Sequence, residues 1–152
     1  MTPDQKCFDF IKSREGLRLN AYQDSAGIWT IGYGTIHYED NTPVKKGDSI
    51  TQARADQLIE SDISARSIKV NAALVPAVLN QNQYNAIVSF AYNAGIGALL
   101  SSTLLKQIKA NPGNPAIRDS FMVWNKVHQN GKLVAVKGLT IRRAAEADMY
   151  FS

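Results

Sequence analysis

Residues 14–36 read R-E-G-L-R-L-N-A-Y-Q-D-S-A-G-I-W-T-I-G-Y-G-T-I, and the predictions for the whole chain start from this stretch. It holds two carboxyl groups, Glu15 and Asp24, followed by Thr30. Helical spacing precedes Glu15, whereas Asp24 opens a turn and Thr30 lies in an aromatic, β-branched strand. Two carboxyl groups held on different elements suit acid/base hydrolysis of a glycosidic bond. One protonates the leaving oxygen, and the other acts on water or on the developing cation.

The composition narrows the class of protein. The chain has 152 residues, of which 45% are hydrophobic, and this suits one folded domain. It contains no apolar run of about eighteen residues, and its first residues lack the apolar stretch of a signal peptide. The single cysteine, Cys7, cannot form an internal disulfide, which fits a reducing compartment. We expect Cys7 to be a core residue.

The net charge of +4 is unevenly distributed. Residues 1–100 carry nine Lys and Arg against ten Asp and Glu, whereas residues 101–152 carry eight against three. A basic second half fits a polyanionic partner such as cell-wall polymer, nucleic acid or a membrane surface, or serves only solubility. Because no segment combines aromatic and basic residues as nucleic-acid binders do, we predict no nucleic-acid partner. Two distant histidines and one cysteine also argue against a metal site.

Local signals place the expected helices and turns. Thr2 is expected to cap a helix over residues 3–14, with Gln5 completing a Thr-x-x-Gln box and Gly16 ending the helix. Glu15 then lies in the last turn, where the negative end of the helix dipole favours the protonated acid.

The rest of the chain predicts mainly helices. Thr51 should cap a long helix that ends near Asn71, and the nearly apolar segment 84–95 predicts a buried helix. Asn130-Gly131 is typical of a two-residue hairpin turn. A last helix is expected to open near Gly138.

The stretch that begins at Glu15 resembles the phage-type lysozyme (endolysin) family, glycoside hydrolase family 24, in the pattern E-G-L-R-L-x-x-Y-x-D-x-x-G-x-x-T-I-G-x-G. Residues 83–95 and the segment G-L-x-x-R-R-x-x-E at 138–146 also resemble that family. The resemblance implies an α+β, mainly α, lysozyme-like two-lobe fold with a small antiparallel β-sheet lobe, a long connecting helix and a helical lobe.

The expected organisation is one lysozyme domain over residues 1–152. Its β lobe would cover about 15–50 and its connecting helix about 51–71. The helical lobe would comprise about 72–152 together with the helix at 3–14.

The resemblance also implies roles for individual residues. Glu15 would donate a proton to the leaving oxygen. Asp24, with Thr30, would orient and activate water or stabilise the transition state, with inversion as the favoured outcome. No cofactor or metal is implied.

Four further residues are assigned by the same resemblance. Ile36, Tyr92 and Thr103 would contact the sugar chain, and Arg143 would support the site by reaching the catalytic Glu. Thr35 stands where the family very often has His, so the ion pair of that His is absent here.

The implied function is an endolysin that hydrolyses β-1,4 bonds between N-acetylmuramic acid and N-acetylglucosamine in bacterial peptidoglycan, which leads to host cell lysis. A lytic transglycosylase and a catalytically inactive cell-wall-binding module remain alternatives. We expect a monomer without an integral membrane segment, held in the host cytoplasm until its release to the cell wall or periplasm.

Overall fold

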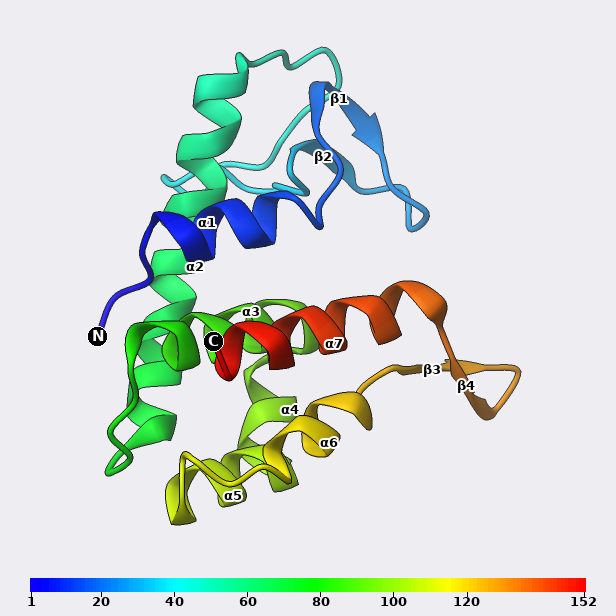
Figure 1. Ribbon diagram of the computed structural model, residues 1–152. Helices are drawn as coiled ribbons and strands as arrows, with labels where there is room; N and C mark the ends of the chain where they lie inside the picture. Colours follow the sequence, from blue (N-terminus) through cyan, green and yellow to red (C-terminus); the bar gives the residue numbers. More distant parts are fainter. The chain divides into compact units, whose positions relative to one another are not determined.

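The computed structural model describes all 152 residues and is mainly helical, with two separate two-stranded antiparallel sheets (Figure 1). This confirms the predicted α+β, mainly α class. No helix combines the length and hydropathy needed to cross a lipid bilayer. In chain order the elements are α1 Gln5–Lys12, β1 Arg18–Gln23, β2 Trp29–Gly32, α2 Gln52–Leu74, α3 Gln81–Ala94, α4 Ile96–Ser101, α5 Thr103–Ala110, α6 Ile117–Met122, β3 Lys126–Gln129, β4 Lys132–Ala135 and α7 Lys137–Tyr150.

The chain divides into two compact units. Unit 1 comprises Met1–Cys7 and Arg66–Ser152, and unit 2 comprises Phe8–Ala65. Both α1 and α2 contribute residues to each unit. The lobe boundaries expected from the sequence stay a prediction.

The cap of α1 differs from the prediction. The Asp4 carboxylate accepts the N–H of Cys7 at 3.1 Å, and α1 begins at Gln5, so Asp4 rather than Thr2 caps the helix. Asp4 is fixed there because the side-chain amide of Asn85 donates to the same carboxylate oxygen at 2.7 Å. Cys7 is completely buried, as predicted, and burial raises the pKa of its thiol to about 12.

The core of unit 2 forms where the first half of α2 meets the end of β2. The Thr51 hydroxyl accepts the N–H of Arg54 at 3.1 Å, which confirms the predicted cap, and α2 then runs to Leu74. Gly32 adopts a φ of +64°, and a Cβ there would lie 3.3 Å from the Cβ of Ala55. Glycine therefore allows β2 to approach α2 closely. The buried apolar residues of unit 2 include Ile11, Ile31, Ala55, Leu58, Ile59 and Ile63.

The core of unit 1 lies between α3 and α7, which run side by side (Figure 1). Phe90 on α3 makes edge-to-face contacts with Phe121 and Trp124, with ring centroids 6.1 Å and 5.7 Å apart. The segment from Tyr84 to Ala91 is buried, which confirms the buried helix predicted there. Asn80 and Gln83 start α3 with a capping box.

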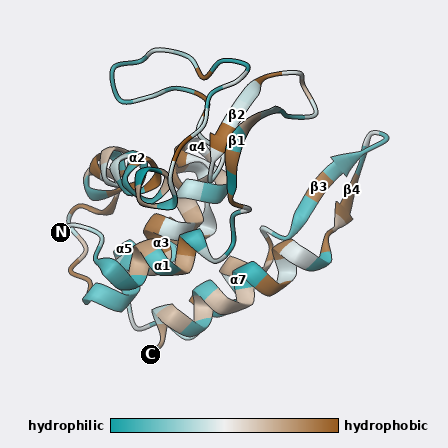
Figure 2. Ribbon diagram, turned by 90° about the horizontal axis from the view of Figure 1, so that it is seen from above, coloured by the Kyte–Doolittle hydropathy of each residue, from teal (hydrophilic) through white to brown (hydrophobic).

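The strands β3 and β4 form a hairpin that extends away from the helices of unit 1 (Figures 1 and 2). Asn130 and Gly131 both have positive φ, 52° and 76°, as a type I′ turn requires. The predicted Asn-Gly turn is therefore confirmed.

A fully buried carboxylate, Glu146, ties α7 to α3. The Ser89 hydroxyl donates to Glu146 Oε1 at 2.7 Å, and Arg142 Nε donates to the same oxygen at 3.2 Å. Arg143 donates to the other oxygen, Oε2. Two guanidinium groups and a hydroxyl thus compensate the charge of a carboxylate that has no exposed surface.

We expect Glu146→Gln to lower the free energy of unfolding by about 3–5 kcal/mol, because it leaves two buried cations without their counter-charge. Chemical denaturation monitored by circular dichroism measures this. The matched control is Glu39→Gln, which breaks the more exposed ion pair with Arg54 (2.7 Å) and should cost less than about 1 kcal/mol. Equal losses for the two variants would contradict a structural role for the Glu146 network.

Candidate active site

Glu15 lies three residues beyond the end of α1, not in its last turn as the sequence predicted. The helix ends at Lys12 because the next amides donate to carbonyls only three residues back: Arg14 to Ile11 at 2.9 Å and Glu15 to Lys12 at 3.1 Å. The prediction from the helix dipole therefore does not apply to Glu15. The side chain is half-buried, on a turn that leads into β1.

Asp24 directly follows β1 and organises the turn of the first hairpin. Its Oδ1 accepts the N–H groups of Ala26 at 2.8 Å and Ile28 at 2.9 Å. Its own N–H donates to the carbonyl of Ile28 at 2.9 Å and closes the turn. The hydrogen bonds to its carboxylate all engage Oδ1, so Oδ2 can face solvent or a substrate. Asp24 is thus both a turn residue and a carboxylate held in one orientation.

Thr30 pairs with Tyr22 across the same hairpin and is almost completely buried. Its hydroxyl donates to the carbonyl of Ile28 at 2.9 Å. While that bond holds, the hydroxyl oxygen can accept a hydrogen bond from a bound molecule but has no proton to donate. This suits a group that orients water.

β1 separates Glu15 from Asp24, and this strand is not straight. Arg18 pairs with Gly32 and Tyr22 pairs with Thr30, so β1 holds two more residues than β2 between these pairs. An irregularity of this kind bends the strand. A bend shortens the direct path between the residues at its two ends.

The three predicted sugar contacts divide between the units. Ile36, in unit 2, exposes 38% of its surface. Tyr92 and Thr103 belong to unit 1, where Tyr92 is half-buried and Thr103 is exposed at the first position of α5. The guanidinium of Arg66 lies over the Tyr92 ring, 5.1 Å from its centroid. Sugar binding by all three stays a prediction.

Arg143 is buried among partners of unit 1. It donates from Nε to the carbonyl of Trp124 at 3.0 Å, and from its terminal nitrogens to Glu146 and to the side chain of Asn93. It also lies 4.9 Å from the centroid of the Phe90 ring. Burial lowers the pKa of Arg143 from its ordinary value, while the Glu146 carboxylate opposes that shift. Its predicted contact with Glu15 stays a prediction.

The structure therefore brings Glu15, Asp24, Thr30 and Ile36 into one compact unit. Asn93 binds Arg143 although no sequence signal indicated this contact within the helix predicted at 84–95. No three His, Cys, Asp or Glu side chains gather into a group that could hold a metal ion.

The sequence and the fold of the chain are both similar to those of known proteins. The model of the phage lysozyme family matches residues 12–146. The endolysin of Acyrthosiphon pisum secondary endosymbiont phage 1 is 41% identical, over 97% of each chain.

Two solved structures are similar over nearly the whole chain. The endolysin from Escherichia coli O157:H7 phage FAHEc1 has a TM-score of 0.90 and 43% identity, covering 99% of this chain and 93% of its own. The muramidase domain of SpmX from Asticaccaulis excentricus has a TM-score of 0.85 and 32% identity, covering 98% and 97%. The family pattern and the full-length relatives agree, and the chain belongs to the phage lysozyme family.

Proposed function

We propose that the protein is an endolysin that hydrolyses the β-1,4 bond between N-acetylmuramic acid and N-acetylglucosamine in bacterial peptidoglycan. One observation carries this proposal. The Asp24 carboxylate, held by two backbone N–H groups, shares one unit with Glu15 and with the hydroxyl of Thr30. The names of its relatives agree with it, since they are endolysins and a muramidase domain.

In the proposed mechanism Glu15, as the acid, protonates the glycosidic oxygen of the leaving sugar. Asp24 carries the negative charge that activates a water molecule or stabilises the oxocarbenium-like transition state. Thr30 accepts a hydrogen bond from that water while its own hydroxyl donates to the carbonyl of Ile28. The distance between the two carboxyl groups in a substrate complex decides the stereochemistry, with about 6.5–9.5 Å favouring inversion and about 5–5.5 Å favouring retention.

The rest of the proposal concerns where the protein acts and with what. Endolysins act on the cell wall, and we propose peptidoglycan as the partner here. Ile36, Tyr92 and Thr103 contact the glycan chain, and the basic second half of the sequence faces its anionic groups. The protein acts as a monomer without nucleic acid, and accumulates in the host cytoplasm before it reaches the wall.

We expect Glu15→Gln to lower turnover of purified sacculi by about 100-fold or more, because the amide cannot donate a proton to the leaving oxygen. Loss of turbidity measures the rate, and thermal unfolding checks that the variant is folded. Glu39→Gln serves as the control, since it removes an acid of the same unit that is paired with Arg54. A Glu15→Gln protein that clears walls at the wild-type rate would remove Glu15 as the acid.

The variant Asp24→Asn distinguishes the role of Asp24 in the turn from its proposed role in catalysis. The asparagine oxygen can still accept the N–H groups of Ala26 and Ile28, so the hairpin should keep its stability. Its charge is lost, and we expect turnover to fall by about 100-fold or more. Retained activity would show that the carboxylate serves only the turn.

Product chemistry distinguishes hydrolysis from the alternatives. We expect mass spectrometry of digested wall to find new reducing ends that carry one added water. Anhydro ends at N-acetylmuramic acid would instead identify a lytic transglycosylase, which needs no activated water. A wild-type protein that binds sacculi but releases no product would be a binding module.

A further inference from the structure

We propose that Lys12, Tyr33 and Asp56 are positioning residues that join the turn of Glu15 to the hairpin of Asp24 and Thr30. The inference deepens the proposed function and rests on it. These residues meet with Asp9 and Glu60 in a group that we call the Lys12 cluster, which lies entirely in unit 2.

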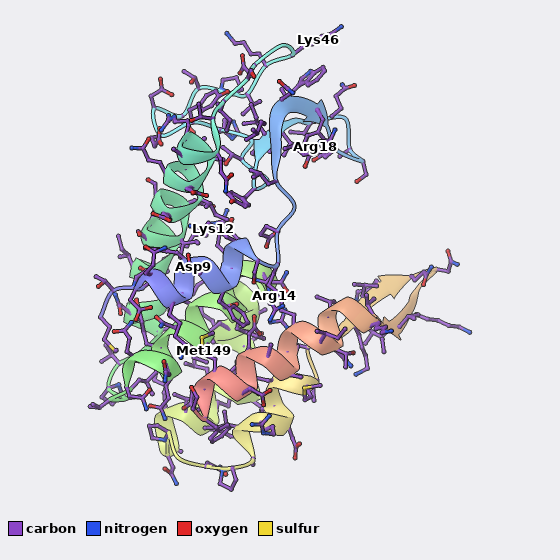
Figure 3. All side chains as sticks on the ribbon, turned by 45° about the horizontal axis from the view of Figure 1, so that its top comes forward. Asp9, Lys12, Arg14, Arg18, Lys46 and Met149 are labelled. Atoms are coloured by element: carbon purple, nitrogen blue, oxygen red, sulfur yellow. The ribbon has the colours of Figure 1, made fainter.

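The first arm of the cluster fixes the end of α1. Lys12 Nζ donates to Glu60 Oε1 at 2.9 Å and lies 3.9 Å from Asp56 Oδ1, so the last residue of α1 is tied to two acids of α2. A third acid, Asp9, lies 3.6 Å away. Figure 3 shows Asp9 and Lys12 together on α1. The carbonyl of Lys12 accepts the N–H of Glu15 at 3.1 Å, so this arm leads directly to the proposed acid.

The second arm fixes the end of β2. Tyr33 directly follows Gly32, whose lack of a side chain brings β2 against α2. The Tyr33 hydroxyl donates to Asp56 Oδ1 at 2.9 Å. Thr30 lies three residues before Tyr33, within β2, and belongs to the hairpin that carries Asp24.

Both arms therefore reach Asp56 Oδ1. The Tyr33 hydroxyl donates to it, and Lys12 Nζ, whose hydrogen bond goes to Glu60, lies 3.9 Å from it. Asp56, near the start of α2, therefore contacts both the segment that leads to the proposed acid and the segment that leads to its acidic partner. Misplacement of a catalytic group by about 1 Å can cost about 100-fold in rate, so a rigid joint at this point has a direct kinetic consequence.

The ion pairs of Lys12 are partly shielded from solvent, and its ammonium group keeps its charge. The side chain of Lys12 is only 14% exposed, so solvent screens its ion pairs less than those at an open surface. Burial by itself lowers the pKa of Lys12, but the carboxylates of Glu60, Asp56 and Asp9 outweigh it and leave the pKa above its ordinary value. Burial and Asp56 likewise raise the pKa of Tyr33, so both donors keep their protons at neutral pH.

The test compares Lys12→Met, Tyr33→Phe and Asp56→Ala with Lys12→Arg, which keeps the charge. We expect the first three variants to lower kcat on soluble peptidoglycan chains by about 10-fold, while KM changes less than twofold and the protein stays folded. Lys12→Arg should restore most of the rate. Glu39→Gln, at a separate ion pair of α2, is the matched control and should leave kcat unchanged.

Combined variants test whether the two arms meet on Asp56. Adding Tyr33→Phe to Asp56→Ala should lower kcat little further, because the hydrogen bond between the two side chains is already lost. Additive losses, or a kcat that falls only in proportion to the folded fraction, would overturn the proposal.

A readout without turnover separates this proposal from the function itself. Exchange of the Glu15 amide hydrogen, which is bonded to the Lys12 carbonyl, should quicken by about 10-fold or more in Lys12→Met and stay slow in Glu39→Gln. If the wild-type protein releases no product but this exchange responds as expected, the proposed function fails and the joint stands. If the wild-type protein is active and exchange does not respond, only the joint fails.

Discussion

A carboxylate with no exposed surface, Glu146, holds together the larger of the two units. Alone, such a charge would be costly to bury, but it is bound by Arg142, Arg143 and the hydroxyl of Ser89. Arg143 in turn reaches Asn93 and the carbonyl of Trp124, so one buried acid links α7, α3 and the segment that leads into the β3–β4 hairpin. This network explains why charged and polar side chains lie buried between α3 and α7, and why the loss of one of them should weaken the contacts of the others.

In the smaller unit, acidic side chains lie at defined positions on short elements of secondary structure. β1 and β2 are too short to be rigid by themselves, because an isolated two-stranded hairpin is only marginally stable. The structure supports them in two ways. Asp24 binds the backbone of its own turn, and Gly32 allows the end of β2 to lie against α2. The polar contacts of α2 with Lys12 and Tyr33 complete that support.

Much of the local structure could be predicted because the signals act over a few residues. Asn130-Gly131 predicted the hairpin turn, Thr51 predicted the cap of α2, and the apolar segment predicted the buried α3. Of the two wrong predictions for α1, one has a distant cause and the other a local cause. Thr2 and Asp4 both suit a helix cap, and the choice between them depends on Asn85, which is 81 residues away. The end of α1 was expected at Gly16, but the chain tightens into three-residue turns one helical turn earlier.

The sequence by itself determined which residues carry the proposed chemistry, because Glu15, Asp24 and Thr30 stand in one continuous pattern whose spacing does not depend on distant segments. Only the tertiary structure decided which contacts stabilise each unit. Tyr33 meets Asp56 across 23 residues, Lys12 meets Glu60 across 48, and Ser89 meets Glu146 across 57. A charged side chain in a helix looks the same in sequence whether it faces solvent or a buried partner. Folding brings the partner into contact, and this contact distinguishes a charge that supports the structure from one that only faces solvent.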